Sequence, residues 1–477
     1  MKVLAVASEM HPFIKTGGLA DVVGALPAAL APHGVEVRTL IPGYPAVLSA
    51  LPKRTRVQAY PELFGAKAVL TSAKHGDTYL FILDCPDFFG RSGGPYSDML
   101  GNDWPDNWRR FAALSAVAAD IASGRVKRWE PDLIHAHDWQ GAMSLAYARF
   151  GAAANKKRVI AIHNLAFQGR YGSEIFPDLG LPPEAWGVDG VEYYGGTGYL
   201  KAGLISADAI TTVSPTYARE IRSPGNGMGL DGLLSGRGDK LHGILNGIDA
   251  AEWDPASDEH LAGCYNARSL SKRAANRKTV ERSFNLQRDK SPLFIVISRL
   301  TWQKGMDQLA AVVNNIVNLG GKLALLGSGD HPIEGAFLAA AQRHPGRVGV
   351  RIGYDEKLSH MMQAGGDAIL IPSRFEPCGL TQLYGLRYGC VPVAARVGGL
   401  ADTIVHANDA ALSSGAATGI LFDPSEAGLM QAIEDTVALY ADKPAWQSMQ
   451  RAAMHADFSW HRSAARYAAL FRSLVSE

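Results

Sequence analysis

Short apolar runs separated by longer amphipathic stretches recur along the whole chain. The first run, Val3–Ala7, precedes a glycine turn and a helical pattern that extends to about Leu30. Because such runs are continuously apolar rather than alternating, they predict strands buried on both faces, as in parallel sheets covered by helices. The further strands predicted for this first series are Val35–Leu40, Tyr79–Leu83, Leu133–His135, Arg158–His163 and Ala209–Val213.

A second series of apolar runs begins at Leu293–Ser298, after a turn signal at Leu245–Asp249 and a polar stretch at Ala267–Lys290. It continues with Lys322–Leu326, Val348–Ile352, Ala368–Ile371 and Val391–Ala394. Two series of this kind predict an α/β protein with two doubly wound domains, 1–245 and 246–457. The segment 458–477 carries a predicted amphipathic helix, Ser459–Val475, and its spacing leaves open whether it crosses back to the first domain.

The composition narrows the class of protein. Among 477 residues, 47 Lys and Arg balance 46 Asp and Glu, for a net charge of +1. A nucleic-acid or acidic-membrane binder usually carries a basic excess, so neither partner is expected. The four cysteines are scattered, and no apolar stretch reaches the roughly 18 residues of a membrane span. We therefore expect a cytoplasmic two-domain enzyme.

Several motifs look chemical but are weak. Gly327–Pro332 begins like a dinucleotide fingerprint, yet proline stands at its third glycine position. Gly90–Gly94 matches the letters of a hydrolase nucleophile elbow, but Pro95 blocks the helix that an elbow requires. His135 and His137 share a strand face without an apparent third ligand, so we expect no metal there.

A five-residue match recurs in the chain, once at Gly17–Asp21 and once at Gly398–Asp402. Each copy has two glycines ahead of a helical pattern. That arrangement exposes helix-start N–H groups, which suits phosphate, but the glycines would serve a tight turn equally well. Both interpretations stay open for each copy.

Three segments at predicted strand ends combine charge with backbone donors. They are Lys15–Leu19, Arg299–Gly305 and Glu376–Leu380. Together they offer three cations, glycine-rich backbone and one carboxylate. Fixed cations of this kind stabilise the negative charge that develops on a departing diphosphate.

These segments also carry a family resemblance, which covers essentially the whole chain. The matching parts are Lys15–Asp21, His135–Trp139, His163–Asn164, Asn246–Asp249, Ser298–Gly305 and Ser373–Leu380. In these motifs the chain resembles the bacterial glycogen synthases and plant starch synthases, which are retaining glucosyltransferases.

The resemblance implies a GT-B architecture, with two Rossmann-like domains facing across a cleft. The first domain would bind the acceptor glucan and the second the nucleotide sugar. Glucose would pass from ADP-glucose to the non-reducing 4-OH of an α-1,4-glucan such as glycogen, with retention and without a cofactor.

The family pattern also implies roles for individual residues. The implied catalytic residues are Glu376, His163 (through its backbone carbonyl), Arg299, Lys304 and Lys15. The implied nucleotide-sugar site adds Gly17, Gly18, Asn164, Asn246, Tyr354, Cys378, Gly379, Leu380 and Thr381. The implied acceptor site comprises Tyr96, Asp138 and Trp139, with the Trp139 ring offered to a sugar face.

One position departs from many related retaining transferases. Those enzymes carry a second glutamate eight residues after the first, where this chain has Tyr384. Glycogen and starch synthases commonly lack that acid too.

The rival hypotheses for the function of the whole protein are a phosphorylase-like enzyme with lysine-bound pyridoxal phosphate, a non-catalytic glycan-binding scaffold and, last, a dehydrogenase.

Overall fold

The computed structural model describes residues 1–127 and 129–476, and the chain divides into two compact units. Unit 1 comprises Met1–Gly247 together with the segment from Trp460 onward, and unit 2 comprises Ile248–Ser459. The chain therefore passes from one unit to the other twice. At the two crossings Ile248 N donates to Phe458 O at 2.9 Å, so both crossing segments pair within unit 2.

Unit 1 is built on a nine-stranded sheet in the order β12-β11-β7-β6-β1-β2-β5-β4-β3. From β12 to β5 all neighbours are parallel. These strands are β1 (Lys2–Val6), β2 (Glu36–Pro42), β5 (Thr78–Asp84), β6 (Leu133–His137), β7 (Lys157–Ile162), β11 (Ala209–Thr212) and β12 (Leu241–Gly243). All strands predicted for the first series are present.

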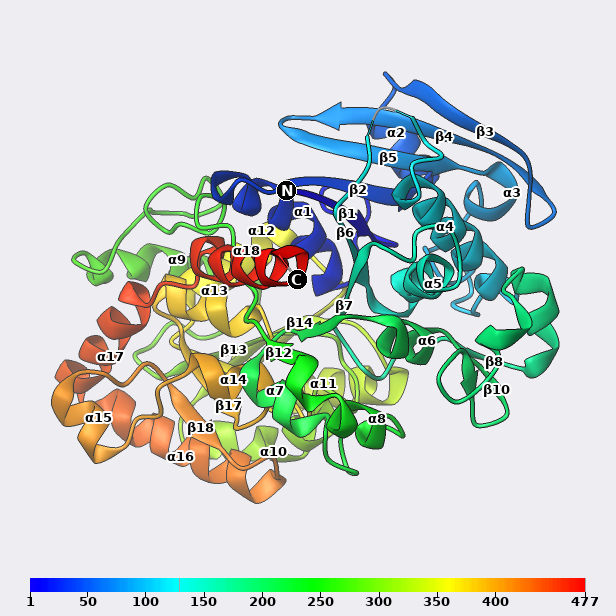
Figure 1. Cartoon of the computed structure of the whole chain (residues 1–477). Coiled ribbons are helices and arrows are strands. Elements are labelled where there is room, and N and C mark those ends of the chain that lie inside the picture. Colours follow the sequence, from blue (N-terminus) through cyan, green and yellow to red (C-terminus); the bar gives the residue numbers. More distant parts are fainter. Residues whose placement is uncertain (128, 477) are drawn as a thin grey trace. The chain divides into compact units, whose positions relative to one another are not determined.

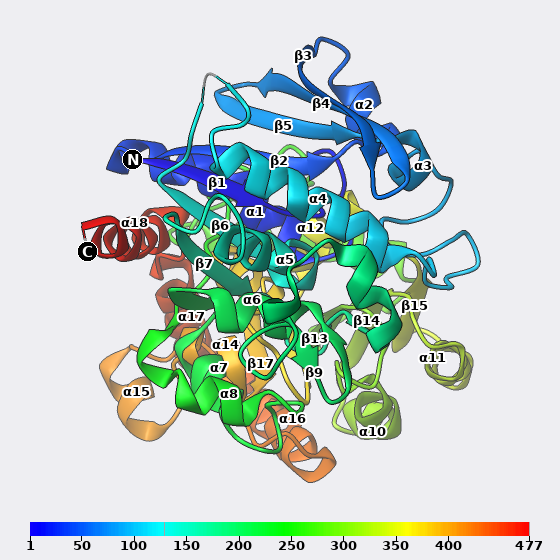
Figure 2. The same cartoon turned by 45° about the vertical axis from the view of Figure 1, so that its right-hand side comes forward.

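Alternate residues of β1 pack against different helices. Val3 and Ala5 face α1 (Gly18–Leu30) and α18 (Trp460–Ser476), whereas Leu4 and Val6 face the side of α4 (Asn107–Ala122) and α5 (Asp138–Arg149). In Figure 1 the red α18 lies beside the blue α1, although the two are separated by most of the sequence. Figure 2 shows α4 and α5 across the other face. Burial on both faces explains why these strands are continuously apolar.

An antiparallel hairpin, β3 (Thr55–Leu63) and β4 (Ala66–His75), extends the sheet beyond β5. The sequence pattern does not predict it, because β3 is exposed along most of its length and lacks an apolar run. A second small sheet of unit 1 contains β8 (Arg170–Tyr171), β10 (Gly196–Gly198) and β9 (Glu192–Tyr193). The remaining α-helices of this unit are α2 (Pro45–Ala50), α3 (Pro86–Phe89), α6 (Tyr199–Ser206), α7 (Pro215–Glu220) and α8 (Asp231–Gly236).

Unit 2 contains a six-stranded, entirely parallel sheet in the order β15-β14-β13-β16-β17-β18. The strands are β13 (Leu293–Ile297), β14 (Lys322–Gly327), β15 (Val348–Ile352), β16 (Ala368–Ile371), β17 (Val391–Ala395) and β18 (Ile420–Phe422). Numbered within the unit, this order is 3-2-1-4-5-6, that of the dinucleotide-binding Rossmann fold. The prediction of two doubly wound α/β domains is therefore confirmed as a fold class.

The helices of unit 2 are α9 (Arg273–Ser283), α10 (Met306–Asn318), α11 (His331–Arg343), α12 (Glu356–Gly365), α13 (Thr381–Tyr388), α14 (Gly398–Thr403), α15 (Asp409–Ser414), α16 (Glu426–Ala441) and α17 (Lys443–His455). Of these, α9 precedes β13, one helix follows each strand from β13 to β16, and two helices follow each of β17 and β18. None of the helices in the described part of the chain is long and apolar enough to span a bilayer.

Candidate active site

In unit 2 the strand order reverses between β13 and β16. Open parallel sheets bind ligands outside the carboxyl ends of their strands at such a switch point. The loop after β13 carries Arg299 and Lys304, and the loop after β16 carries Glu376. Lys304 Nζ donates to Glu376 Oε2 at 2.5 Å. The structure thus brings together two of the strand-end segments that the sequence singled out.

The Glu376 carboxylate also accepts a hydrogen bond from a second side chain. Ser373 Oγ donates to the same oxygen, Oε2, at 2.9 Å, and only 6% of Glu376 is exposed. A charge so nearly buried needs both a cation and hydrogen bonds. Arg299 is exposed at the start of its loop, so a cation is also presented to solvent.

Further contacts join these two loops. Arg374 donates to both carboxylate oxygens of Asp307 at 2.6 and 2.7 Å, and its guanidinium lies 4.5 Å from the centre of the Trp302 ring. The backbone N–H of Arg374 donates to Gln303 O at 2.9 Å. The position of Lys304 relative to Glu376 is therefore fixed by the surrounding loop structure and not by the ion pair alone.

The segment Glu376–Leu380 is held from behind by Gln382, a residue that sequence reasoning missed. Gln382 is fully buried, and its amide Nε2 donates to Cys378 O at 3.0 Å and to Gly379 O at 2.9 Å. Gly379 has a φ of +72°, which favours glycine. The segment thus enters α13 at Thr381 in a defined backbone conformation.

The second copy of the repeated motif packs behind the same segment. A Cβ on Gly398 would fall far inside van der Waals distance of Glu376 O, and one on Gly399 would do the same with Cys378 O. Gly398 also has a φ of +41°. The close approach of these two backbone segments therefore requires glycine at both positions.

Tyr354 follows β15 and is 67% exposed, with its hydroxyl donating to Glu356 Oε2. An exposed ring at a strand end can stack on a nucleotide base. Tyr384, which replaces the second glutamate of related transferases, instead stacks on Trp253 with ring centres 3.6 Å apart. At this position the chain therefore has an aromatic ring that packs on Trp253 where the related transferases have a glutamate carboxylate.

In unit 1 the strand order reverses between β1 and β6. The loop after β1 is organised by Glu9, which is 2% exposed and was missed by sequence reasoning. Its carboxylate accepts from Thr16 Oγ1 at 2.6 Å, from Thr16 N and from the hydroxyl of Tyr96. Tyr96 is also 2.7 Å from Ser8 Oγ, so the structure places Tyr96 against the first-strand loop.

Lys15 and Gly17 end that loop in exposed positions. Lys15 Nζ lies 2.8 Å from Asp21 Oδ1, and both side chains are partly accessible. Gly17 is extended, with φ −163°, and a Cβ placed on it would meet no atom within 4 Å. Unlike Gly398, Gly17 has open space beside it, and Gly18 then begins α1. The first copy of the motif is therefore free to let a ligand approach its backbone.

Asp138 lies at the carboxyl end of β6, next to β1. It is buried, has a positive φ of 50°, and accepts from the backbone N–H of His163 at 2.7 Å. Burial raises the pKa of this carboxyl to about 7, although the hydrogen bonds from the backbone of His163 and Asn164 oppose the shift. Asn164 Oδ1 accepts from Ala166 N at 3.1 Å, which shapes the turn after β7.

Three buried histidines, His135, His137 and His163, pack side by side. His137 Nδ1 lies 2.9 Å from His163 Nε2, and the His135 and His137 ring centres are 4.2 Å apart. Burial lowers the pKa of His135 to about 3 and of His163 to about 4, and it holds the pKa of His137 well below its usual value. All three are therefore neutral at pH 7.

Trp139 lies differently from the open ring face that was expected. It is 8% exposed and packs among Phe111, Tyr171 and Tyr199, with ring centres 5.0 to 6.2 Å away. In this position the ring is part of the hydrophobic core of unit 1. Asn246, which the family resemblance assigns to the nucleotide-sugar site, is 5% exposed. It lies next to Gly247, where the first segment of unit 1 ends.

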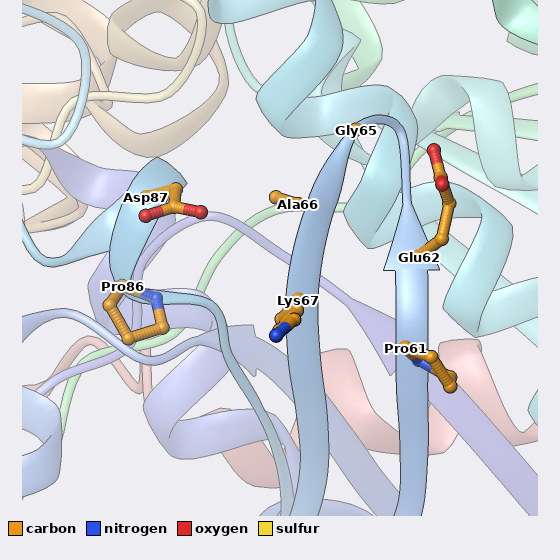
Figure 3. Close-up of a pocket in the computed structure, with 7 residues that line it drawn as sticks. All are labelled: Pro61, Glu62, Gly65, Ala66, Lys67, Pro86 and Asp87. Atoms are coloured by element: carbon orange, nitrogen blue, oxygen red, sulfur yellow. The ribbon is translucent and has the colours of Figure 1, made fainter.

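A surface pocket of about 480 Å³ lies elsewhere in unit 1, between the β3–β4 hairpin and the start of α3. Figure 3 shows Glu62 and Lys67 on its two strands and Asp87 on the helix. Its lining contains none of the predicted site residues.

Two family models match the chain. The starch synthase catalytic domain matches residues 2–236, and glycosyl transferases group 1 matches residues 277–452. Among solved structures, the chain is similar to the catalytic domain of Starch Synthase IV from Arabidopsis thaliana bound to ADP and acarbose. The TM-score is 0.89 and the identity 31%, over 100% of this chain and 99% of that one.

The fold is also shared with a sucrose-phosphate synthase from Thermosynechococcus elongatus, at a TM-score of 0.59 and 17% identity over 100% of this chain and 99% of that one. The two Rossmann-like units and their matches define a glycosyltransferase of the GT-B class. Relatives with similar sequences identify the family within this class. Glycogen synthases from Mesorhizobium japonicum and Novosphingobium aromaticivorans are 60% and 58% identical over 100% of this chain and 99% of theirs. The chain belongs to the glycogen synthase family.

Proposed function

We propose that this protein transfers glucose from ADP-glucose to the non-reducing 4-OH of an α-1,4-glucan, with retention, as a cytoplasmic enzyme of glycogen synthesis. The observation that carries the proposal is the Lys304–Glu376 pair at the switch point of unit 2, beside the exposed Arg299. The relatives named glycogen synthase and the starch synthase structure bound to ADP and acarbose support the donor and acceptor classes.

Breaking the bond between glucose C1 and the diphosphate oxygen leaves negative charge on ADP. Arg299 and Lys304 would bind that charge more strongly as it develops, which lowers the barrier. We assign Lys15 and the backbone N–H groups of Gly17 and Gly18 to the same diphosphate. The open space beside Gly17 supports this assignment, because it lets a phosphate oxygen approach the backbone closely.

The sugar carries the complementary positive charge. Glu376 would stabilise that charge and orient the donor glucose, while the backbone of Cys378 to Thr381 would contact sugar hydroxyls and phosphate. Because the Glu376 carboxylate is already bound by Lys304, we favour this positioning role over attack on C1. In the proposed front-face displacement the acceptor enters on the side from which ADP leaves. The His163 carbonyl and Asn164 would then lie toward the donor glucose.

The acceptor would be bound in unit 1. Asp138 and Tyr96 offer a carboxyl and a hydroxyl group for glucan hydroxyls, both at or beside the β1 and β6 strand ends. We place Trp139 behind them as a supporting ring, because its ring packs among Phe111, Tyr171 and Tyr199. Tyr354 would stack on the adenine, and Asn246 would contact the bound ligand. This reaction requires no cofactor, because the fixed cations supply the electrophilic assistance.

The proposal is tested by Glu376→Gln, which keeps the size of the side chain and removes its charge. We expect ADP affinity to change by less than about threefold while turnover falls roughly 10²–10³-fold. Calorimetry with ADP and a coupled ADP-release assay measure the two quantities. A matched control is Glu434→Gln, at a helical position outside the two switch points. A Glu376→Gln enzyme with near-normal turnover would contradict the central assignment.

A further inference from the structure

Two glutamates and a histidine of unit 2 converge outside the switch point. Glu252 lies shortly after the first crossing segment, and Glu356 and His360 are four residues apart on α12. Residues at this spacing share one helix face. One donor atom from each of the three lies within 4.8 Å of the other two. We refer to Glu252, Glu356 and His360 as the Glu-Glu-His cluster.

His360 is the buried member of this cluster, at 1% exposure. Its Nδ1 lies 2.8 Å from Asp258 Oδ2, which also accepts from the Tyr388 hydroxyl at 2.6 Å. Because a carboxylate only accepts, Nδ1 is the donor in this contact, and in the neutral imidazole Nε2 is then an acceptor. Trp253 stacks on the ring at 3.7 Å with an interplanar angle of 15°, so the ring orientation is fixed.

The Nε2 atom points toward the glutamates. It makes no hydrogen bond with any residue that the structure describes, and Glu356 Oε1 lies 3.9 Å away. Buried ring nitrogens of this kind usually have a partner. An imidazole whose Nδ1 is bound to a carboxylate and whose Nε2 faces further carboxylates has the arrangement of a metal-ligating histidine.

We propose that the Glu-Glu-His cluster binds a divalent transition-metal cation, with Zn²⁺ as the preferred ion. One imidazole nitrogen and two carboxylate oxygens are suitable ligands, and water would complete the coordination. Two ligands at about 2.0–2.1 Å from zinc are roughly 3.3 Å apart at the tetrahedral angle. The observed 3.9 Å closes to that value by small rotations of an exposed glutamate side chain.

The bound ion would have a structural role. Glu356 Oε2 accepts from Tyr354, so a cation on Oε1 would connect the loop that carries Tyr354 to the segment that carries Glu252. The ion would thereby restrain Tyr354, which we assign to adenine stacking. This consequence rests on the proposed function, whereas metal binding itself does not.

The test is a Zn²⁺ titration of the full-length, chelator-stripped protein, in competition with a chromophoric chelator. We expect one tight site per chain. Glu252→Gln should weaken it by at least about 10-fold, because removing a direct ligand costs no less than removing an outer partner. The control is Glu426→Gln, since Glu426, like Glu252, is an exposed glutamate of unit 2 and lies outside the cluster.

His360→Asn would remove the buried ligand, but it also disturbs the pairing with Asp258. The exposed Glu252 variant therefore keeps the proposal falsifiable even if the His360 variant does not fold. Co²⁺ offers a second readout, because a four-coordinate site gives intense visible absorption that Glu252→Gln should abolish. Absence of a tight site, or equal Zn²⁺ affinity in the wild type and Glu252→Gln, would overturn the proposal. Zinc binding in a chain without glucosyltransferase activity would overturn only the proposed function.

Discussion

The two copies of the Gly-Gly-Leu-Ala-Asp motif should respond oppositely to alanine. At Gly398 the methyl group meets Glu376 O, and the φ of +41° is unfavourable for alanine. The left-handed conformation costs about 1–2 kcal/mol and displacement of the neighbouring backbone about 1–3 kcal/mol. We therefore expect Gly398→Ala to destabilise unit 2 by about 2–5 kcal/mol, and to lower its melting temperature by roughly 2–4 °C per kcal/mol.

At Gly17 the same substitution meets open space and an extended backbone. Alanine is a poorer N-cap than glycine, which lowers the stability of the folded protein. It also restricts the unfolded chain, which raises the stability, so the two effects oppose each other. The net change in stability should be below about 1 kcal/mol. Turnover should nevertheless fall by roughly 10²-fold, because the methyl group would displace the diphosphate by about 1 Å.

Thermal unfolding and ADP release, measured on both variants and the wild type, separate the two effects. Residual activity of Gly398→Ala is compared only at temperatures where it is folded. A Gly17→Ala enzyme with normal stability and normal turnover would refute the role of this backbone in binding diphosphate. A Gly398→Ala protein as stable as the wild type would refute the steric argument.

Three further predictions concern single groups. Gln382→Leu leaves two loop carbonyls without their amide donor and should cost about 2–4 kcal/mol in urea unfolding of unit 2, whereas unchanged stability would contradict this. Lys304→Met should lower turnover roughly 10²–10³-fold, with a smaller effect on ADP affinity, and comparable losses in both would argue for ground-state binding alone. Stability should fall as the pH decreases from about 6.5 to 4, because the three buried histidines of unit 1 have lowered pKa values and take up protons on unfolding. Asp138, with its pKa raised to about 7, acts in the opposite direction, so these four groups together contribute a slope of about 3 kcal/mol per pH unit in the middle of this range. Asp138→Asn should steepen it, and a flatter profile in that variant would contradict the sign.

The parallel strands could be predicted because burial on both faces leaves a continuous apolar signature. β15 and β16 have the predicted ends, and β13 differs from its prediction by one residue. The β3–β4 hairpin has no such signature, because its edge strand β3 is exposed along most of its length and lacks an apolar run. The short strands β12 and β18 have only three residues each, which is too few for a pattern.

The site was predictable where chemistry and strand ends coincide, as in the segments that hold Lys304 and Glu376. Gln382 could not be recognised, because a glutamine inside a helical pattern gives no sign that its amide binds loop carbonyls. Glu9 lies two residues after the end of the first apolar run, so its place near a strand end was visible although its partners were not. The exposure of Gly17 and the crowding at Gly398 depend on tertiary packing, and the identical letters of the two copies cannot distinguish them.

The Glu-Glu-His cluster could likewise not be predicted from the sequence, because it depends on tertiary packing. The spacing of Glu356 and His360 predicts a shared helix face, but Glu252 is about one hundred residues away and joins them only in the folded unit. For Trp139 the sequence predicted an exposed ring that the folded unit does not have. Its place after a strand suggested a ring open to sugar, whereas the aromatic side chains around it bury it.

The central claim is tested most directly by nucleoside diphosphate release from ADP-glucose and from UDP-glucose, each with and without glycogen and repeated in excess EDTA. We predict release of ADP that requires glycogen and persists in EDTA, because the proposed transfer relies on fixed side-chain and backbone charges. Release of ADP without glycogen would indicate a hydrolase or another acceptor. No release from either donor by a protein that still binds glycogen would contradict the account and favour a non-catalytic glycan-binding scaffold.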